Sequence, residues 1–204
     1  MARAKKIQDV EERLERTERQ LLMLQTISRL MVRKMSLPEI LKAVVDLVVD
    51  VTTADACLIY LREGDELVLC ASNTPHPSQI GRLRLKMGEG ITGWVARERR
   101  MVVIGQQASR DPRFRFFHDL PEDTFEAFLS VPLISRGDIV GVINVQHRQA
   151  RRHSGSEIEM MVTVGEQVGC VIVLAELGEL GTMPRTVVDQ LLASPPILTG
   201  KKLS

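Results

Sequence analysis

Two apolar segments near the middle of the chain define the centre of the predicted fold. Residues 127–134 and 139–145 are apolar almost throughout and rich in valine and isoleucine, and a polar Ser-Arg-Gly-Asp sequence at 135–138 joins them. Short apolar runs separated by a glycine-containing polar turn are typical of a β-hairpin. Because neither run alternates regularly with polar residues, we expect both faces of this hairpin to be covered.

Further apolar runs predict strands that extend the hairpin. Residues 56–61 and 67–71 form a second hairpin around a polar turn, while 80–87 and 101–104 each predict a short strand. Because hairpin strands are antiparallel, neighbouring strands of the predicted sheet should run in opposite directions.

Three segments with helical spacing of apolar residues should cover this sheet, namely 37–51, 91–99 and 155–177. A capping-box pattern of serine and glutamate precedes two of them, at Ser36 with Glu39 and at Ser154 with Glu157.

The first 35 residues contain neither glycine nor proline and predict a separate amphipathic helix. Most of its heptad core positions are apolar, with Ile7, Leu14, Leu21 and Ser28 in one set and Val10, Thr17, Leu24 and Met31 in the other. This repeat indicates a coiled-coil seam and a homodimer; the alternative is a lone helix folded back on its own domain. Leu22, Ile27 and Leu30 lie off the seam and predict a second buried contact.

The expected organisation is therefore a coiled-coil helix at 1–35, one domain at 36–180 and a C-terminal extension at 181–204. The extension has one short apolar run and ends in a basic sequence, so it should be mobile or weakly docked.

Composition narrows the functional classes. The chain has 27 basic and 26 acidic residues, a balance that argues against a nucleic-acid partner. Cys57, Cys70 and Cys170 lie in apolar stretches without C-x-x-C spacing, so we expect small buried side chains in a reducing compartment. Neither a membrane-spanning run nor a signal peptide is evident, which predicts a cytoplasmic protein without a membrane partner.

The sequence Gly88-Glu89-Gly90-Ile91-Thr92-Gly93 matches the G-x-G-x-x-G string of dinucleotide sites. Such sites also need a parallel strand that ends in an acidic residue about 20 positions later, and the predicted hairpins are antiparallel. The glycines are therefore expected to permit a tight turn, and amides at the helix start could also hold an anion.

Residues 105–126 carry the strongest compositional anomaly. All five phenylalanines of the chain fall between Phe114 and Phe128, and Arg110, Arg113 and Arg115 accompany them. A long segment without helical or strand periodicity is typical of a binding loop, and aromatic walls with a few charges suit a small-molecule pocket. The alternative is that the phenylalanines anchor an irregular loop on the core.

Catalysis and metal binding find little support in the residue pattern. The chain has no G-x-S-x-G elbow, and its four histidines lack H-x-x-x-H spacing. His147 and His153 could approach each other around the intervening loop. However, four arginines at 136, 148, 151 and 152 should repel a cation, so no metal ligand is predicted.

The order of these elements resembles the GAF domain family. Three stretches carry the likeness: Gly88-Glu89-Gly90-Ile91-Thr92-Gly93-Trp94-Val95, Phe128-Leu129-Ser130-Val131-Pro132-Leu133 and Gly141-Val142-Ile143-Asn144-Val145. The variant that the chain most resembles is the N-terminal sensory domain of the nitrogen-branch phosphoenolpyruvate–protein phosphotransferase. Asp111-Pro112-Arg113-Phe114 and Phe125-Glu126-Ala127-Phe128-Leu129 carry that closer likeness.

The resemblance implies an α+β fold with a six-stranded antiparallel sheet, helices on both sides, a pocket under a long loop and dimers through terminal helices. It also lets family chemistries be compared residue by residue. Asn144 matches the cyclic-nucleotide members, but Gln146, His153 and Glu157 replace other residues of their pattern. The cysteines that bilin-binding and methionine-sulfoxide-reducing members need are absent from the corresponding positions.

The leading hypothesis is a non-enzymatic sensor without a cofactor, which binds a small anionic or zwitterionic metabolite such as an amino acid, dimerises and signals to a protein partner. Arg110 or Arg113 would hold a carboxylate or phosphate in a bidentate contact. The candidate ligand-binding residues are Tyr60, Trp94, Arg110, Asp111, Arg113, Phe114, Phe117, Phe125, Phe128 and Ser130. The alternative is a dimerisation or protein-interaction module whose pocket is filled by its own phenylalanines.

Overall fold

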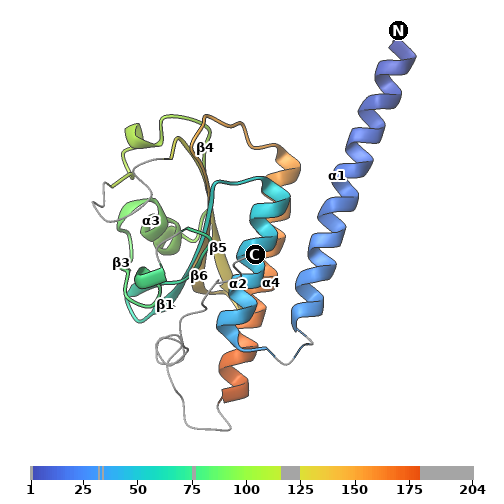
Figure 1. The fold of residues 1–204 in the computed structure, drawn as a ribbon. Helices are drawn as coiled ribbons and strands as arrows, with labels where there is room; N and C mark the ends of the chain where they lie inside the picture. Colours follow the sequence, from blue (N-terminus) through green and yellow to red (C-terminus); the bar gives the residue numbers. More distant parts are fainter. Residues whose placement is uncertain (1, 32, 34, 75–76, 116–124, 180–204) are drawn as a thin grey trace, which may run out of the picture.

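A six-stranded antiparallel sheet forms the centre of the domain, in the order β3-β2-β1-β6-β5-β4 (Figure 1). The computed structural model describes residues 2–31, 33, 35–74, 77–115 and 125–179. The strands are β1 Ala56–Glu63, β2 Glu66–Ser72, β3 Arg84–Lys86, β4 Val102–Ile104, β5 Ala127–Ser135 and β6 Asp138–His147. The predicted α+β class and the antiparallel strand order are confirmed.

Both predicted hairpins are present, and they meet at the middle of the sheet. β5 and β6 form one and β1 and β2 the other, and β6 also pairs with β1. Ile143 of β6 lies opposite Val131 on one side and Ile59 on the other, and all three side chains are buried. The central strands therefore lack the alternation of a sheet with one face in water, as their sequence predicts.

Helices cover both faces of this sheet. α2 (Leu37–Thr52) and α4 (Gly155–Glu179) lie on one face, and α3 (Gly90–Glu98) lies on the other (Figure 1). At the start of α2 the Glu39 carboxylate accepts hydrogen bonds from the Ser36 N–H at 2.8 Å and from its hydroxyl group at 2.7 Å. The sheet thus separates two apolar cores, one under α2 and α4 and the other under α3.

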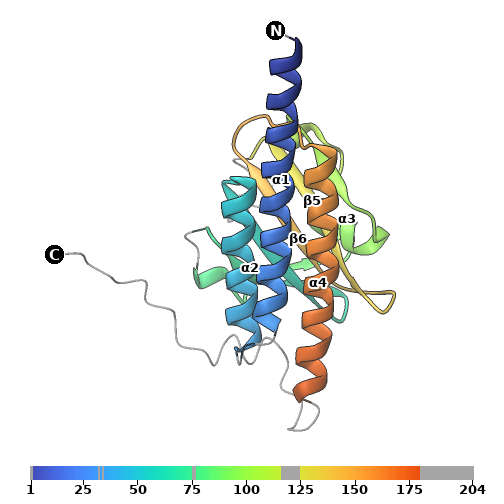
Figure 2. The same ribbon diagram turned by 90° about the vertical axis from the view of Figure 1, so that its right-hand side faces the viewer.

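The N-terminal helix α1 (Ala2–Met31) lies on α2 and α4, on their side away from the sheet (Figure 2). Met23, Ile27 and Leu30 bury their side chains there, whereas Leu22 is exposed. The second buried contact expected from the sequence is therefore present, but Met23 takes the place predicted for Leu22. The first turns of α1 extend past the domain (Figure 1).

Although no long uninterrupted apolar run is evident in the sequence, one helix among the described residues has the length and composition of a candidate membrane span. Gly155–Ala175 of α4 has a hydropathy of 1.7, enough for a candidate span. Met161, Val164 and Val168 of this segment are buried in the core beside the sheet. A core helix meets the same criterion, so packing within the domain accounts for its apolar character.

The two outer strands, β3 and β4, are three residues long. The strand expected over 80–87 is restricted to Arg84–Lys86, because the Gln79 carbonyl accepts the N–H groups of Arg82 and Leu83 and holds that stretch in a turn. The predicted loop 105–126 contains a short 3-10 helix, η2 (Ala108–Arg110), while 116–124 and the extension from 180 onward lie outside the described residues.

The cysteines divide into two environments. Cys57 and Cys70 are buried as predicted, but Cys170 is exposed on α4. Burial raises the pKa of the Cys70 thiol to about 12 and raises that of Cys57 as well, so both remain protonated and unreactive near neutral pH. The prediction for Cys170 was wrong because α4 is not buried on all sides.

Candidate functional site

A glycine-rich turn positions the start of α3 above the sheet. The Gly88 N–H donates to the Gly93 carbonyl at 2.7 Å, and the Gly93 N–H donates to the Glu89 carbonyl at 2.9 Å. A Cβ atom at position 93 would overlap the Lys86 carbonyl oxygen. The G-x-G-x-x-G string therefore serves a close strand-to-helix turn in an antiparallel sheet, as the sequence analysis favoured.

An open hollow of about 480 Å³ lies beside this turn. The β3–α3 turn and α3 bound one side, and the segment that follows η2 bounds the other. Its lining combines aromatic and cationic side chains, including Lys86, Trp94, Arg97, Arg113, Phe114 and Arg115. Aromatic walls with a few charges are the surroundings that bind small polar molecules.

Arg113 is held in a fixed position at this hollow. Its guanidinium lies 4.7 Å from the centre of the Trp94 ring, and it donates to both Asp111 carboxylate oxygens, from Nε at 2.8 Å and Nη2 at 2.7 Å. These hydrogen bonds lower the pKa of Asp111 below its ordinary value and raise that of Arg113. Arg113 is thus preorganised, with Asp111 already taking two of its donors.

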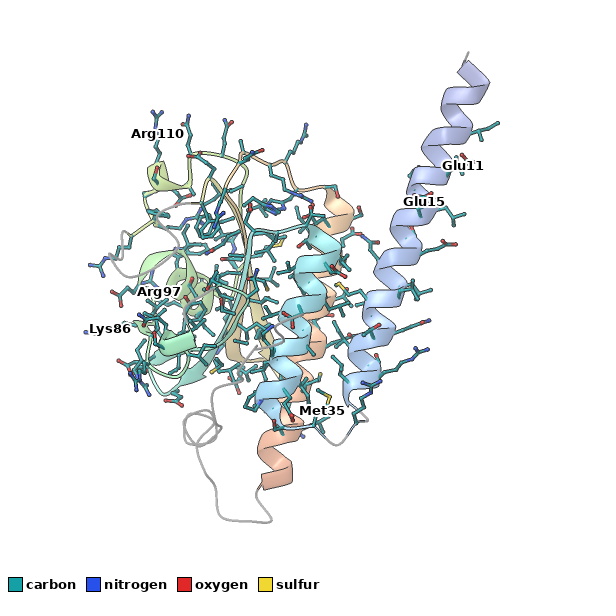
Figure 3. All side chains as sticks on the ribbon, in the orientation of Figure 1. Glu11, Glu15, Met35, Lys86, Arg97 and Arg110 are labelled. Carbon is teal, nitrogen blue, oxygen red and sulfur yellow. The ribbon has the colours of Figure 1, made fainter. Side chains whose placement is uncertain are left out.

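The other cations differ in their placement. Arg115 pairs with Glu89 at 2.7 Å and so links the segment after η2 to the start of α3. Lys86 and Arg97 also lie beside α3, whereas Arg110 points away from the domain at another end (Figure 3). The arginines that line the hollow are each paired with a carboxylate, Arg97 with Glu98 as well as Arg113 and Arg115, and Arg110 is not among the lining residues.

Three phenylalanines pack together beneath the hollow. The Phe128 ring makes edge-to-face contacts with Phe114 and Phe125, with ring centres 6.0 and 6.4 Å apart. Phe125 and Phe128 are buried, and Phe114 packs against the same core under α3. These rings anchor the long segment on the sheet, which was the alternative interpretation of the phenylalanine cluster.

A buried polar network joins β5, β6 and α3 below this site. The Ser130 hydroxyl donates to Asn144 Oδ1, and Asn144 Nδ2 donates to Thr92 Oγ1 at 2.8 Å. All three side chains are almost fully buried. Both polar atoms of the Asn144 side chain therefore have partners within the protein. This structural role accounts for an asparagine at the position that matches the cyclic-nucleotide pattern.

Replacing Asn144 with alanine should lower the free energy of unfolding by about 2 kcal/mol, because it leaves the Ser130 and Thr92 hydroxyl groups buried without this partner. Urea denaturation measures the change. Gln149→Ala, at an exposed position, should change it by less than about 0.5 kcal/mol and serves as the control. Equal stability of Asn144→Ala and the unmodified chain would contradict the network's role.

The structure brings only part of the predicted site together. Trp94, Arg113 and Phe114 line the hollow, with Asp111 paired to Arg113. Tyr60 is fully buried in the core under α3. Phe125, Phe128 and Ser130 are also buried, and Phe117 lies outside the described residues.

Sequence reasoning did not select Lys86, Met87 or Arg97, which also line the hollow. The sequence did contain one signal for these residues, the G-x-G turn beside them, because amides at the helix start predicted a possible anion site there. Placing that turn next to residues 112–115 required the path of the chain between α3 and η2, which the residue pattern does not show.

Comparison with known proteins now identifies the family. The GAF domain model matches residues 34–173, well over half of the chain. The chain belongs to the GAF domain family. GAF domains are regulatory modules of the signalling and sensory type, and the resemblance stated from the sequence is confirmed.

The GAF domain is similar to those of phosphoenolpyruvate phosphotransferases. The chain is 29% identical over 181 residues to the "Phosphoenolpyruvate-dependent phosphotransferase system" protein of Escherichia coli K12, covering 86% of this chain and 24% of that one. The GAF domain of the phosphotransferase from Coxiella burnetii superposes with a TM-score of 0.74 at 26% identity, covering 80% of this chain and 98% of that structure.

The GAF domain of the Acinetobacter phosphoenolpyruvate-protein phosphotransferase gives a TM-score of 0.70 at 29% identity, covering 80% of this chain and 98% of that structure. The likeness to solved structures therefore extends over nearly the whole of each isolated GAF domain. By contrast, this chain spans about a quarter of the length of the curated relatives it matches.

Proposed function

We propose that this chain is a sensory GAF module that binds a small anionic or zwitterionic metabolite in the hollow beside α3. The observation that carries the proposal is the Arg113 guanidinium, fixed over the Trp94 ring at 4.7 Å and held by Asp111. A preorganised cation beside an aromatic face favours a ligand with a carboxylate or phosphate and an apolar part. Lys86 and Arg97 add positive charge around the same space.

A route from this hollow to the helical layer supports a signalling role. α3 contacts β5 and β6, these strands contact α4, and α4 contacts α1. In the proposal, ligand binding in the hollow shifts the balance between two positions of α4 relative to α1. α1 in turn forms a homodimer, through which a protein partner reads the change.

Titration calorimetry tests the binding step with amino acids, 2-oxo acids and nucleotides as probes. At least one should bind with a Kd below about 1 mM, which corresponds to about 4 kcal/mol. Arg113→Ala should weaken that binding at least about 10-fold because the fixed cation is lost. Arg110→Ala, an exposed arginine outside the lining, is the matched control and should leave the Kd unchanged.

Two results would contradict this proposal. If no probe class binds below about 1 mM, the sensing role fails. If Arg110→Ala weakens binding as much as Arg113→Ala does, the ligand occupies another place. Thermal unfolding of both variants beforehand separates a loss of binding from a loss of the fold.

A second candidate function rests on the packed phenylalanines. Because Phe128 contacts Phe114 and Phe125 edge to face, protein side chains fill the space under the long segment. This observation favours a dimerisation or protein-interaction module that needs no small ligand. A chain that dimerises but binds none of the probes would support this function.

A further inference from the structure

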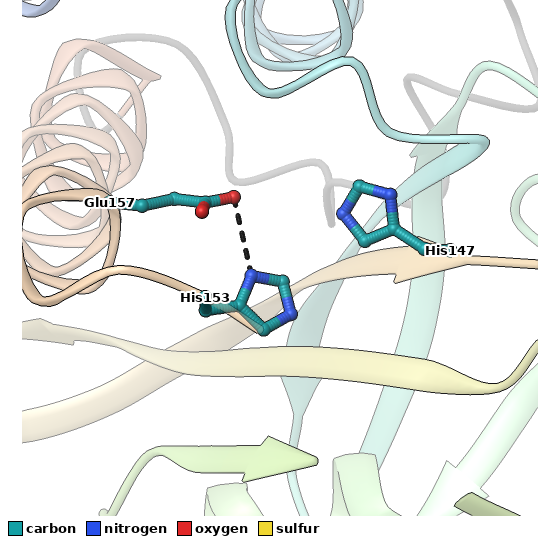
Figure 4. A group of neighbouring side chains, drawn as sticks. All are labelled: His147, His153 and Glu157. Atoms are coloured by element: carbon teal, nitrogen blue, oxygen red, sulfur yellow. Dashed lines mark hydrogen bonds and ion pairs between the residues drawn. The ribbon is translucent and has the colours of Figure 1, made fainter. Parts of the chain in front are cut away.

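Two histidines and a glutamate gather at the corner where β6 leads into α4. His147 is the last residue of β6, His153 lies in the connecting loop, and Glu157 lies in the first turn of α4. Their potential donor atoms all lie within 4.8 Å of one another. Figure 4 shows a His147 ring nitrogen turned toward the space between His153 and Glu157.

Both histidines are deeply buried and have nitrogens without a partner. His147 and His153 are 4% and 7% exposed, and neither Nε2 atom has a hydrogen-bond partner among the described residues. His153 Nδ1 lies 3.2 Å from Glu157 Oε1, so one side of its ring is oriented. A ligand between these side chains would give the buried His147 Nε2 the partner that it lacks among the described residues.

The charge around the cluster is more balanced than the sequence indicated. Arg136 lies in the turn before β6, so the ten residues of that strand place it about 30 Å from His147. Arg151 donates to Glu157 Oε1 at 3.3 Å and to Thr53 Oγ1 at 3.0 Å. Arg136 is therefore not a neighbour of the cluster, whereas Arg151 lies beside it and is paired with Glu157.

The three side chains also have the chemistry of metal ligands. Neutral imidazole and carboxylate are the forms that bind a metal ion, and His147, His153 and Glu157 supply these groups.

We propose that His147, His153 and Glu157 bind a zinc ion. Two imidazoles and one carboxylate are an established zinc donor set, which leaves a fourth position for water or another ligand. Tetrahedral zinc needs donor atoms about 3.4 Å apart, so small side-chain rotations bring this cluster to bonding distance. Arg151 donates to the same Glu157 Oε1 that faces His153, and so orients the carboxylate in the way that outer partners orient metal ligands.

An adjoining hollow gives the ion access. It measures about 450 Å³, and Thr52, Thr53, Arg151 and Glu157 are among its lining residues together with Gln20 of α1. Gln20 Nε2 donates to the Ser156 carbonyl at 3.0 Å, so α1 contacts the start of α4 next to this site. A bound ion would thus join β6 to α4 at the point where α1 rests.

Zinc titration of the metal-stripped full chain, in competition with a chromophoric chelator, tests the site. One zinc ion per chain should bind, with a Kd below about 1 μM. Glu157→Gln keeps the shape but removes the anionic ligand, so the Kd should rise at least about 10-fold. His147→Gln combined with His153→Gln should abolish stoichiometric binding.

Matched variants control for charge and for unspecific histidine binding. Glu159→Gln makes the same change at an exposed position of α4, and His76→Gln with His118→Gln removes the other two histidines. Both should leave the zinc affinity unchanged. Weaker binding in either control, or unchanged binding in Glu157→Gln, would overturn the proposal.

A measurement on the unmodified chain avoids any dependence on variants that fold poorly. Zinc X-ray absorption should show four light ligands with the scattering pattern of two imidazoles. Absence of stoichiometric zinc, or a six-coordinate shell without imidazole, would overturn the proposal. Because this site and the hollow beside α3 share no residues, failure of one leaves the test of the other unaffected.

Discussion

Gly141→Val should lower the free energy of unfolding by about 4 kcal/mol or more. Gly141 lies in β6 opposite Leu61 of β1 and Leu133 of β5. A Cβ atom at this position would overlap the Tyr60 carbonyl oxygen, a backbone atom fixed by the central pairing of the sheet. Since the sheet cannot relax without separating β1 from β6, the strain falls on the pairing between the two hairpins.

Urea denaturation of the purified domain measures this effect. Gly155→Val is the matched control, because a Cβ atom there meets no atom within 4 Å at the start of α4. We expect the control to change the unfolding free energy by less than about 1 kcal/mol. Equal stability of the two variants would show that β1 and β6 tolerate separation at this point.

Leu14→Glu and Leu21→Glu should each weaken self-association at least about 100-fold, because a carboxylate would be buried without a partner in the proposed seam of α1. Ile7, Val10, Leu14 and Leu21 are each more than half exposed in the single chain. They recur at the heptad core positions of a helix whose first turns extend past the domain (Figure 1). A second copy of α1 would cover this apolar stripe.

Light scattering with size-exclusion chromatography measures the result. The mass should fall from that of two chains to that of one, 22.9 kDa. Leu22→Glu provides a matched control, because Leu22 is adjacent in sequence and 60% exposed but lies off the seam. A dimer that survives Leu14→Glu and Leu21→Glu, or dissociates equally with Leu22→Glu, would place the interface elsewhere.

The hairpins and their helices could be predicted because their signals are local. A polar turn such as 135–138 between two valine-rich runs specifies antiparallel pairing without knowledge of the rest of the chain. The length of β3 could not be obtained in this way. The Gln79 carbonyl accepts two N–H groups and delays the start of the strand to Arg84, and apolar periodicity does not report such a competition.

The candidate site was harder to predict, because an aromatic residue that lines a pocket and one that fills a core have the same appearance in sequence. Trp94 and Phe114 lie at the hollow, but Phe125 and Phe128 pack beneath it. The arginines divide similarly, since Arg113 is fixed by Asp111 and Arg110 points away (Figure 3). Side-chain direction depends on the path of the segment, which sequence composition does not determine.

Glu157 shows how one motif can conceal a second role. The sequence predicts that Glu157 belongs to a capping box with Ser154. Its backbone N–H does make the expected cap, donating to Ser154 Oγ at 3.2 Å. Its carboxylate, however, faces His153 and Arg151. The capping motif alone does not show this second role, because the direction of the Glu157 carboxylate depends on the path of the loop after β6.

The short outer strands also determine how copies of this domain can associate. β3 and β4 each offer only a few free backbone groups, and Arg84 and Lys86 place charge along the β3 border. Edges this brief and charged are poor templates for adding strands from another chain, so fibre-like growth through the sheet is disfavoured. The proposed association of two chains should therefore use the helical side, where contacts can close between two molecules and stop.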